Sequence, residues 1–339
     1  MVLKSVKAGL FAAVLLLALL TGWIVRELEA PAAAAAGPQG AFFAVEKGWS
    51  ARRVVGRLQD EGIVRRGPSL LLACRTFYAG ERFKAGEYLF SPPQRAKDAL
   101  FAIFGGRIHL EPVTVPEGLT EREIAELLWP GDADGAAAFR RAALDAALIA
   151  DLDPRARDLE GYLYPNTYHL PRRAPAADLV AAMAGEFRRI FDEDRRRRAG
   201  ELGLSIREIV TLASLIEEET ALPDERPLVS AVFHNRLRIG MKLDCDPTVA
   251  YALKREGRYT GRLLLRDLHF PSPYNTYLHA GLPPGPISNP GRSSLDAALH
   301  PAADSSLYFV TKGDGSHRFS RTLGEHLDAV KKLRALKNR

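Results

Sequence analysis

The chain has 339 residues, 47% of them hydrophobic and 26% charged, so it is long enough to build two folded domains. Its formal net charge of +6 suits an anionic partner such as membrane lipid, cell-wall polymer or nucleic acid. Nucleic acid is disfavoured, because we find no recognition helix, zinc spacing or interleaving of basic and aromatic residues. We also find no glycine-rich phosphate loop and no metal-binding motif, and therefore expect neither a cofactor nor a metal.

The N-terminal segment is predicted to be a membrane anchor. Lys4 and Lys7 precede an uncharged run from Gly9 to Val25. About seventeen residues is short for a membrane span and long for the core of a signal peptide. Because positive charge precedes the run, we expect residues 1–27 to have a short cytoplasmic start and to cross once, with the body of the chain outside. The predicted linker, residues 28–40, contains A-x-A sequences, so a cleaved signal peptide is the alternative.

Residues 41–112 are predicted to form a small α/β module. A strand begins at about Phe42, and a helix with one apolar side follows, for which Ser50 is the expected N-cap. The stretches FKAGEYLFSP and DALFAIFGGRIHLEPVTV then predict a strand, a helix and another strand. This order resembles the LysM-like modules of wall-binding proteins.

Residues 113–339 are predicted to form a larger, mixed α+β domain. Thr120 and Glu123 have the spacing of a capping box at the start of an amphipathic helix. We expect further helices over DGAAAFRRAALDAALIADL, at about 176–199, at about 205–221 and from Leu228. The last segment, SLYFVTKGDGSHRFSRTLGEHLDAV, predicts a β-hairpin followed by a helix.

Three consecutive glutamates, Glu217 to Glu219, end an otherwise apolar helix. Glu217 and Glu219 continue its two apolar faces, so at least one must point inward, whereas Glu218 is expected to be the most solvated. Burial and the nearby helix C-terminus both oppose ionisation. We therefore expect one of these carboxyls to carry a proton near neutral pH. Solvated helix-end charges paired with Arg226 or Arg236 are the alternative.

Two further segments have the composition of a sugar-binding surface. EGYLYPNTYHL groups three tyrosines with Glu160 and Asn166, and SPYNTYLHAGLPPGPISNPG is a proline-rich loop that carries Asn275 and Tyr277. Aromatic faces and polar side chains of these kinds bind sugar rings and their hydroxyls. A packed corner and a surface linker are the respective structural alternatives. We interpret the second segment as the wall of a substrate site.

Nucleophilic and redox chemistry finds little support. The sequence has no G-x-S-x-G elbow and no H-E-x-x-H pair, and its histidines are scattered. Cys74 and Cys245 lie far apart without metal or redox spacing. Two buried, unpaired thiols are the simpler interpretation, and a disulfide between them is the alternative.

Several motifs together resemble the YceG-like family of endolytic murein transglycosylases. They are ASLIEEET, VFHNRLRIGMKLDCDPTVAYAL, SPYNTYLHAGLPPGPISNPG, SLDAALHPA and LYFVTKGDGSHRFSRTLGEH. The resemblance runs from about Phe42 to the C-terminus, with the motifs in the family's order. Departures are minor: Glu218 fills the position between the two acids of the family pattern, and His234 and Cys245 stand at positions that are not diagnostic.

The resemblance implies a single-pass lyase of the bacterial inner (cytoplasmic) membrane, with residues 113–339 as an extracytoplasmic catalytic domain. Such an enzyme cleaves the MurNAc–GlcNAc bond of nascent glycan strands without water, leaves 1,6-anhydro-MurNAc ends and limits strand length. The catalytic glutamate maps to Glu217, where a burial-raised pKa would suit the acid step, and Glu219 is the supporting acid. Peptidoglycan strands are the implied partner, with glycan polymerases or other wall-synthesis proteins added by analogy.

The other candidates are expected to contact substrate or to orient Glu217: Glu160, Tyr164, Asn166, Asn235, Arg236, Asp246, Asn275 and Tyr277. Asn235 and Arg236 lie on a helix with apolar neighbours, so we expect them behind the site. Two rival functions stay open. A hydrolytic muramidase would need a second carboxylate, for which Asp246 is the obvious residue. A wall-binding scaffold would need no catalysis.

Overall fold

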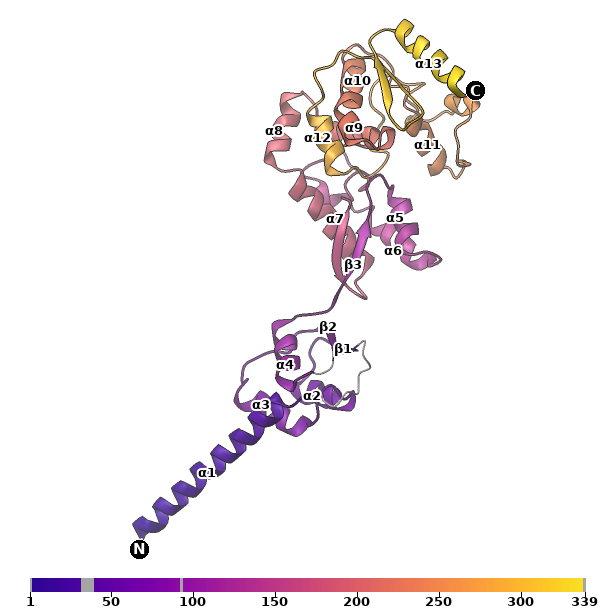
Figure 1. Ribbon diagram of the computed structural model, residues 1–339. Helices are drawn as coiled ribbons and strands as arrows, with labels where there is room; N and C mark the ends of the chain where they lie inside the picture. Colours follow the sequence, from indigo (N-terminus) through magenta and orange to yellow (C-terminus); the bar gives the residue numbers. More distant parts are fainter. Residues whose placement is uncertain (1, 32–39, 92–93, 338–339) are drawn as a thin grey trace. The chain divides into compact units, whose positions relative to one another are not determined.

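The computed structural model describes residues 2–31, 40–91 and 94–337, and it shows a mixed α+β protein with a long apolar helix at the N-terminus (Figure 1). The chain divides into two compact units. Unit 1 comprises Met1–Pro112 and His169–Arg173, and unit 2 comprises Val113–Tyr168 and Ala174–Arg339. Most of the predicted linker, residues 32–39, lies outside the described residues.

The globular part of unit 1 is built on a two-stranded antiparallel sheet. Strand β1 (Ala41–Val45) pairs with β2 (Gly86–Phe90), so that Phe43 lies opposite Tyr88. Three helices complete the core: α2 (Ala51–Asp60), α3 (Gly67–Thr76) and α4 (Ala96–Gly105). The Ser50 side chain accepts from Arg53 N, as expected of an N-cap, and the predicted apolar side of α2 is buried.

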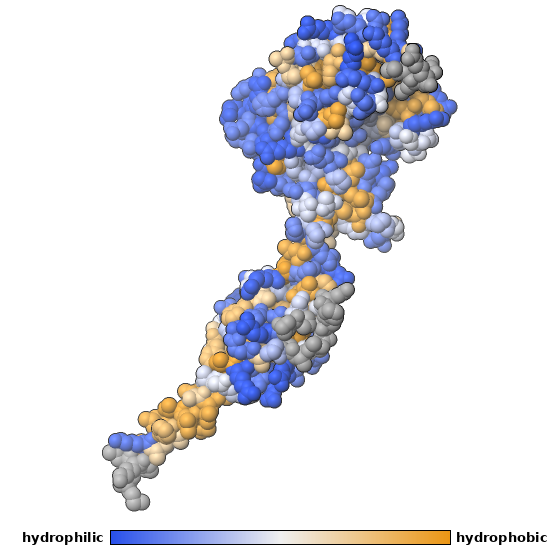
Figure 2. All heavy atoms as spheres, viewed as in Figure 1, coloured by the Kyte–Doolittle hydropathy of each residue, from blue (hydrophilic) through white to orange (hydrophobic). Residues whose placement is uncertain are grey.

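Helix α1 (Val2–Glu29) has two different surfaces along its length. Its segment Val6–Glu29 has a mean hydropathy of 2.4, and most of its large apolar side chains are exposed. Figure 2 shows this apolar surface in orange. Ile24 and Leu28 differ, because they are buried in the same cluster as the core of unit 1. Length and composition suit a membrane span or a signal sequence.

Unit 2 is mainly helical. Its elements are α5 (Glu121–Leu128), α6 (Ala133–Ala142), η1 (Ala146–Ile149), α7 (Ala176–Ile190), α8 (Glu193–Glu201), α9 (Ile206–Glu219), η2 (Pro223–Glu225), α10 (Arg226–Arg238), α11 (Asp246–Arg255), η3 (Leu265–His269), α12 (Arg292–Leu299), β5 (Tyr308–Thr311), β6 (His317–Ser320) and α13 (Leu323–Lys337). A further two-stranded sheet pairs β3 (Leu110–Val115) with β4 (Asn166–Pro171). The predicted C-terminal hairpin and helix are confirmed, with Tyr308 of β5 opposite Ser320 of β6.

Helix α9 is the central element of unit 2. It packs against α8, α10, α11 and α12, as Figure 1 shows. Every residue from Ile209 to Ile216 is buried. Ser205 and Glu208 form a capping box that fixes where the helix begins. The rigid surroundings of α9 determine where the glutamates at its end can point.

Two helix predictions were wrong in the same way. The stretch predicted as one helix at about 176–199 is broken into α7 and α8, because Asp192 caps a new helix by accepting from Arg195 N. Likewise, α6 ends at Ala142 and a short 3₁₀ turn follows, capped by Asp145. In both cases an aspartate inside a helical pattern satisfies the free N–H groups of a new helix start.

Candidate active site at the end of helix α9

The three glutamates at the end of α9 point in different directions. Glu217 and Glu219 are partly buried, whereas Glu218 is exposed, as the helical faces predicted. The next residue, Thr220, leaves the helix with an extended backbone. Three neighbouring carboxyls therefore have three separate environments.

Glu217 is held by two hydrogen-bond donors from other elements. Arg226 Nη2, at the start of α10, lies 2.7 Å from Glu217 Oε1, and the side chains are 9% and 6% exposed. The backbone N–H of Gly291, just before α12, donates to Glu217 Oε2 at 2.9 Å. Both donors hold the carboxyl in one orientation. The Glu217 side chain therefore points inward, as expected of at least one of the three acids. It also forms the ion pair with Arg226 that the alternative interpretation of the glutamates proposed.

Glu117 is a second carboxyl at this position. Its Oε2 lies 3.7 Å from Arg226 Nη1, so Arg226 lies between two acids. Burial and the charge of Glu217 raise the pKa of Glu117. Gly291 leaves room for it, since an added Cβ there would lie 1.9 Å from Glu117 Oε1. We had not singled out Glu117, although the P-E-G turn that carries it is visible in the sequence.

Replacing Gly291 by Ala tests this close approach. The added methyl must displace the Glu117 carboxyl, which is 48% exposed and free to move outward. We expect Gly291→Ala to fold and to lower the activity of this site, because Arg226 loses one of its two acids. Steady-state rates for Gly291→Ala and Glu117→Gln should fall together. Full activity in Gly291→Ala would contradict a role for this contact.

Glu218 faces a cavity of about 420 Å³ beside Glu217. Its lining includes Asp246, Tyr251, Lys254 and Tyr259. Partial burial raises the pKa of Glu218 to about 7, against the opposing effect of the Lys254 charge. Gly118 lines this cavity and also lies close to Glu217. A Cβ added to Gly118 would lie 3.3 Å from Glu218 Oε1 and 3.7 Å from Glu217 Cγ. Polar and aromatic groups thus surround Glu218 in the cavity, and Gly118 separates the cavity from the Glu217 side chain.

Glu219 points to the opposite side, into the protein. Burial raises its pKa to about 7, while a hydrogen bond with Cys245 acts in the other direction. The nearby charges are Asp246, which raises the pKa further, and Arg236, which lowers it. A raised pKa is thus found at Glu218 and Glu219, the direction expected for at least one of the three.

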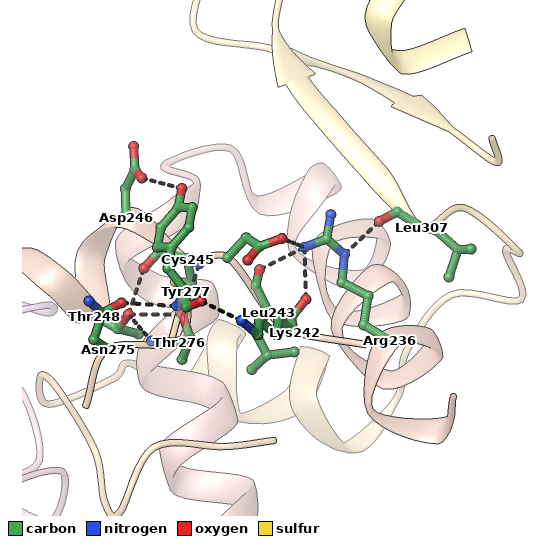
Figure 3. A network of polar contacts seen from close by, with 11 residues as sticks. Arg236, Lys242, Leu243, Cys245, Asp246, Thr248, Asn275, Thr276, Tyr277 and Leu307 are labelled. Atoms are coloured by element: carbon green, nitrogen blue, oxygen red, sulfur yellow. Dashed lines mark hydrogen bonds and ion pairs between the residues drawn. The ribbon is translucent and has the colours of Figure 1, made fainter. Parts of the chain in front are cut away.

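The segments around Glu219 are tied together by a polar network, drawn in Figure 3. Arg236 donates from Nε to Leu307 O at 2.6 Å and from Nη1 to Leu243 O at 2.8 Å. Tyr277 donates its hydroxyl to Asp246 Oδ1 at 2.6 Å, and its N–H binds Asn275 Oδ1 at 2.9 Å. Asn275 is fully buried. Of this group, only Asp246 lines the cavity beside Glu218, so the others support its wall.

Three other predicted site residues bind elsewhere. Asn235 is buried and donates to the carbonyls of Asp304 and Ser306. Asn166 is exposed and donates to Glu186 Oε1 at 3.0 Å. Tyr164 is 7% exposed, and its carbonyl accepts from Tyr168. No contact in the described structure brings these three to Glu217.

Glu160 is a buried acid behind the site. Its Oε1 accepts from Glu121 N at 3.1 Å and from Asn289 Nδ2 at 3.0 Å, and the side chain lines two cavities, of about 1320 and 240 Å³. Burial, and then the charge of Glu121, raise the pKa of Glu160 to about 8. The group is therefore neutral at pH 7 and can donate as well as accept.

Replacing Glu160 by Gln should make the protein less sensitive to high pH. The pKa of Glu160 is about 8 in the folded protein, against an ordinary value of 4.5. Between these two pH values the folded state binds a proton that the unfolded state has lost. The free energy of unfolding of the wild type therefore falls as the pH rises from 4.5 to 8. Each pKa unit is worth about 1.4 kcal/mol, so the variant should gain a few kcal/mol over the wild type by pH 8. Urea unfolding at pH 5 and pH 8 measures this gain. Glu201→Gln, at a side chain 51% exposed, is the matched control. An equal gain at both pH values would contradict the raised pKa.

The segment 287–291 joins these groups. Ile287 N donates to Ser214 Oγ inside α9, and Asn289 Nδ2 donates to Leu119 O as well as to Glu160. Gly291 N then reaches Glu217. Within the predicted loop, Asn289 and Gly291 contact Glu160 and Glu217, whereas Tyr277 contacts Asp246. The sequence signal for this is the I-S-N-P-G ending of the loop.

The described residues contain no cluster of three or more side chains suited to hold a metal ion. Cys74 and Cys245 are free and buried, as the simpler interpretation had it. The chemical groups available at the end of α9 are therefore carboxyls, an arginine, a lysine and tyrosine hydroxyls. These groups suit general acid–base chemistry.

Comparison with known proteins identifies the class. An endolytic murein transglycosylase of Bacillus subtilis is 42% identical over 183 residues, which are 53% of this chain and 49% of that relative. One from Streptococcus pneumoniae is 27% identical over 329 residues, covering 84% of this chain and 58% of the relative. A crystal structure of a YceG-like protein from Listeria monocytogenes matches with a TM-score of 0.57 and 28% identity, over 86% of this chain and 99% of that one.

The fold is therefore that of a solved YceG-like protein, while this chain spans only about half the length of the curated relatives. The sequence profile of the family itself matches residues 43–332, which include the whole of the site described above. The chain belongs to the YceG-like family.

Proposed function

We propose that the chain is an endolytic peptidoglycan lytic transglycosylase that uses Glu217 as its catalytic acid and base. The observation that carries this proposal is the fixed position of the Glu217 carboxyl, held by Arg226 and Gly291 beside a cavity that is lined by polar and aromatic side chains. The relatives named endolytic murein transglycosylases support the choice of substrate.

Bond cleavage needs a proton on the leaving oxygen. Glu217, protonated when substrate covers the site, gives its proton to O4 of GlcNAc as the bond from C1 of MurNAc breaks. Positive charge develops on the muramic ring, and the Glu217 carboxylate left behind faces it. Arg226 and the Gly291 N–H keep that carboxylate aimed at the reacting atoms.

Ring closure uses the same carboxylate as a base. Glu217 removes the proton from the muramic 6-hydroxyl, and O6 bonds to C1 to form the 1,6-anhydro ring. The proton lost in the first step is regained in the second, so no water is consumed and no second carboxylate is required. Cutting of this kind within nascent strands would limit their length.

The cavity beside Glu218 is the proposed place for the sugar on one side of the scissile bond. Tyr259 offers a ring face, and Lys254 and Asp246 offer partners for hydroxyl and acetamido groups. Glu218 is exposed to this cavity and neutral for part of the time at pH 7, so it can donate or accept. Glu219 is proposed to support the site from inside the protein.

Product analysis separates this proposal from its rivals. Uncrosslinked strands digested by the protein should end in 1,6-anhydro-MurNAc, lighter by one water than a reducing end. Reducing ends would instead indicate a hydrolase, with Asp246 as the residue placed to activate water beside the cavity. A protein that binds strands but yields no product would support a scaffold.

The proposed location follows from helix α1 and from the family. We propose that α1 anchors the chain once in the bacterial inner membrane, uncleaved, with the residues that follow α1 on the extracytoplasmic side. Residues 41–112 are proposed to be a LysM-like module that holds wall glycan, and residues 113–339 the catalytic domain. Glycan polymerases or other wall-synthesis proteins are proposed as neighbours at the membrane.

A further inference from the structure

The end of helix α1 is part of the core of unit 1. Ile24 and Leu28 lie one turn apart and are 3% and 7% exposed. They belong to the same buried cluster as Leu70, Ala73 and Cys74 of α3. Side chains of a simple membrane tether would instead stay free of the folded unit.

Ion pairs hold the same two turns. Glu27 lies 3.9 Å from Arg66, and Glu29 pairs with Arg95 at 3.3 Å and also with Lys97. Acids are unfavourable at a helix C-terminus, where the macrodipole is already negative. Here the cations of unit 1 neutralise them, so the charges of α1 and unit 1 match each other.

The length of the apolar run then determines how close unit 1 must come to lipid. From Gly9 to Val25 the run is about 26 Å long at 1.5 Å per residue, against about 30 Å of hydrocarbon in a bilayer. The whole run is needed to cross. Ile24 is one residue from its end, yet it already packs into unit 1.

We propose that the end of α1 is packed firmly into the globular part of unit 1, and that this packing holds unit 1 directly against the headgroup layer of the membrane, with α3 at the lipid interface. The inference rests on the proposed anchoring of α1. The two ends of α3 carry exposed arginines, Arg65 just before it and Arg75 in its last turn, which suit lipid phosphates. The partner of this surface is therefore the phospholipid headgroup.

Headgroup quenching tests the inference in the full chain. A bimane probe is attached to Arg65→Cys or Arg75→Cys, in nanodiscs of phosphatidylethanolamine and phosphatidylglycerol doped with a headgroup nitroxide lipid. Phe42→Cys is the matched control, since Phe42 is 40% exposed on β1 and packs against His109 and Arg172. We expect strong quenching at 65 and 75 and weak quenching at 42. Equal quenching at all three would overturn the proposal.

The two native thiols do not disturb this measurement. Cys74 and Cys245 are buried, and burial raises the pKa of the Cys74 thiol to about 11, so both react slowly with the probe. The chain without an introduced cysteine gives the background.

A second variant tests the docking itself. Ile24→Ala combined with Leu28→Ala keeps α1 apolar but removes its packing on α3. Quenching at 65 and 75 should then fall towards the value at 42. Unchanged quenching would show that the packing of α1 on α3 does not hold unit 1 at the membrane. A full chain that fails to enter nanodiscs would overturn the anchoring as well. Neither failure affects the cleavage of free strands, which tests the proposed function separately.

Discussion

Replacing Glu217 by Gln is expected to slow glycan cleavage by about 10²–10⁴-fold, because the proton donor of the first step and the base of the second are lost together. The amide can still accept one hydrogen bond, from Gly291 N or from Arg226, so the carboxamide should keep nearly the same position. Mass spectrometry of digested strands should show the anhydro ends of the wild type disappearing in the variant.

Glu218→Gln is the matched control for this experiment. The change is chemically the same and lies one residue away, but Glu218 is exposed and makes no ion pair with Arg226. We expect it to lose much less activity than Glu217→Gln, because the Gln amide can still donate to and accept from a sugar in the cavity. Retained activity in Glu217→Gln would contradict the assignment and move it to Glu219 or Glu160, the neighbouring buried acids. Circular dichroism of both variants shows whether a loss reflects chemistry or unfolding.

Replacing Arg226 by Met is expected to cost about 3–5 kcal/mol of stability, since it leaves the buried Glu217 carboxylate without its charged partner. The Arg226 side chain is only 9% exposed, and the pair is therefore poorly screened by solvent. Activity should also fall, because only the Gly291 N–H then holds the carboxyl against the reacting sugar. Urea unfolding and strand turnover measure the two effects on the same preparations.

A double-mutant cycle isolates the pair. Arg226→Met should lower the free energy of unfolding much less in the Glu217→Gln background than in the wild type, because no buried charge is then left unpaired. Arg197→Met is the control, since Arg197 is 63% exposed and its pair with Asp194 should contribute at most about 1 kcal/mol. Fully additive losses at Arg226 and Glu217 would contradict the coupling.

Local rules were enough to predict several parts of the molecule. The Ser50 cap, the Thr120–Glu123 capping box and the C-terminal hairpin depend on residues a few positions apart, and all three are present. The directions of Glu217 and Glu218 followed from helical geometry alone. The two caps are fixed by hydrogen bonds within one helical turn, and the hairpin by strands that are adjacent in the sequence, so a local sequence pattern predicts them directly.

The partners of the acids could not be predicted, because they come from distant segments. Gly291 binds Glu217 across 74 residues, and Asn289 binds Glu160 across 129. Asn166 was grouped with Glu160 on composition, yet its side chain donates to Glu186 instead. The helix breaks at Asp145 and Asp192 were also missed. At each position a capping aspartate competes with a helical pattern that is otherwise continuous, and the pattern alone does not show which of the two prevails.

The segment 287–291 also determines when the site can exist during folding. Its contacts with Leu119, Glu160 and Ser214 close chain loops of up to 170 residues, and closing long loops costs entropy before any contact is gained. We therefore expect the carboxyl of Glu217 to be positioned among the last events of folding. A chain in which segment 287–291 is not yet in place would cut nothing, so the proposed catalytic competence would arise only after this segment has folded onto α9.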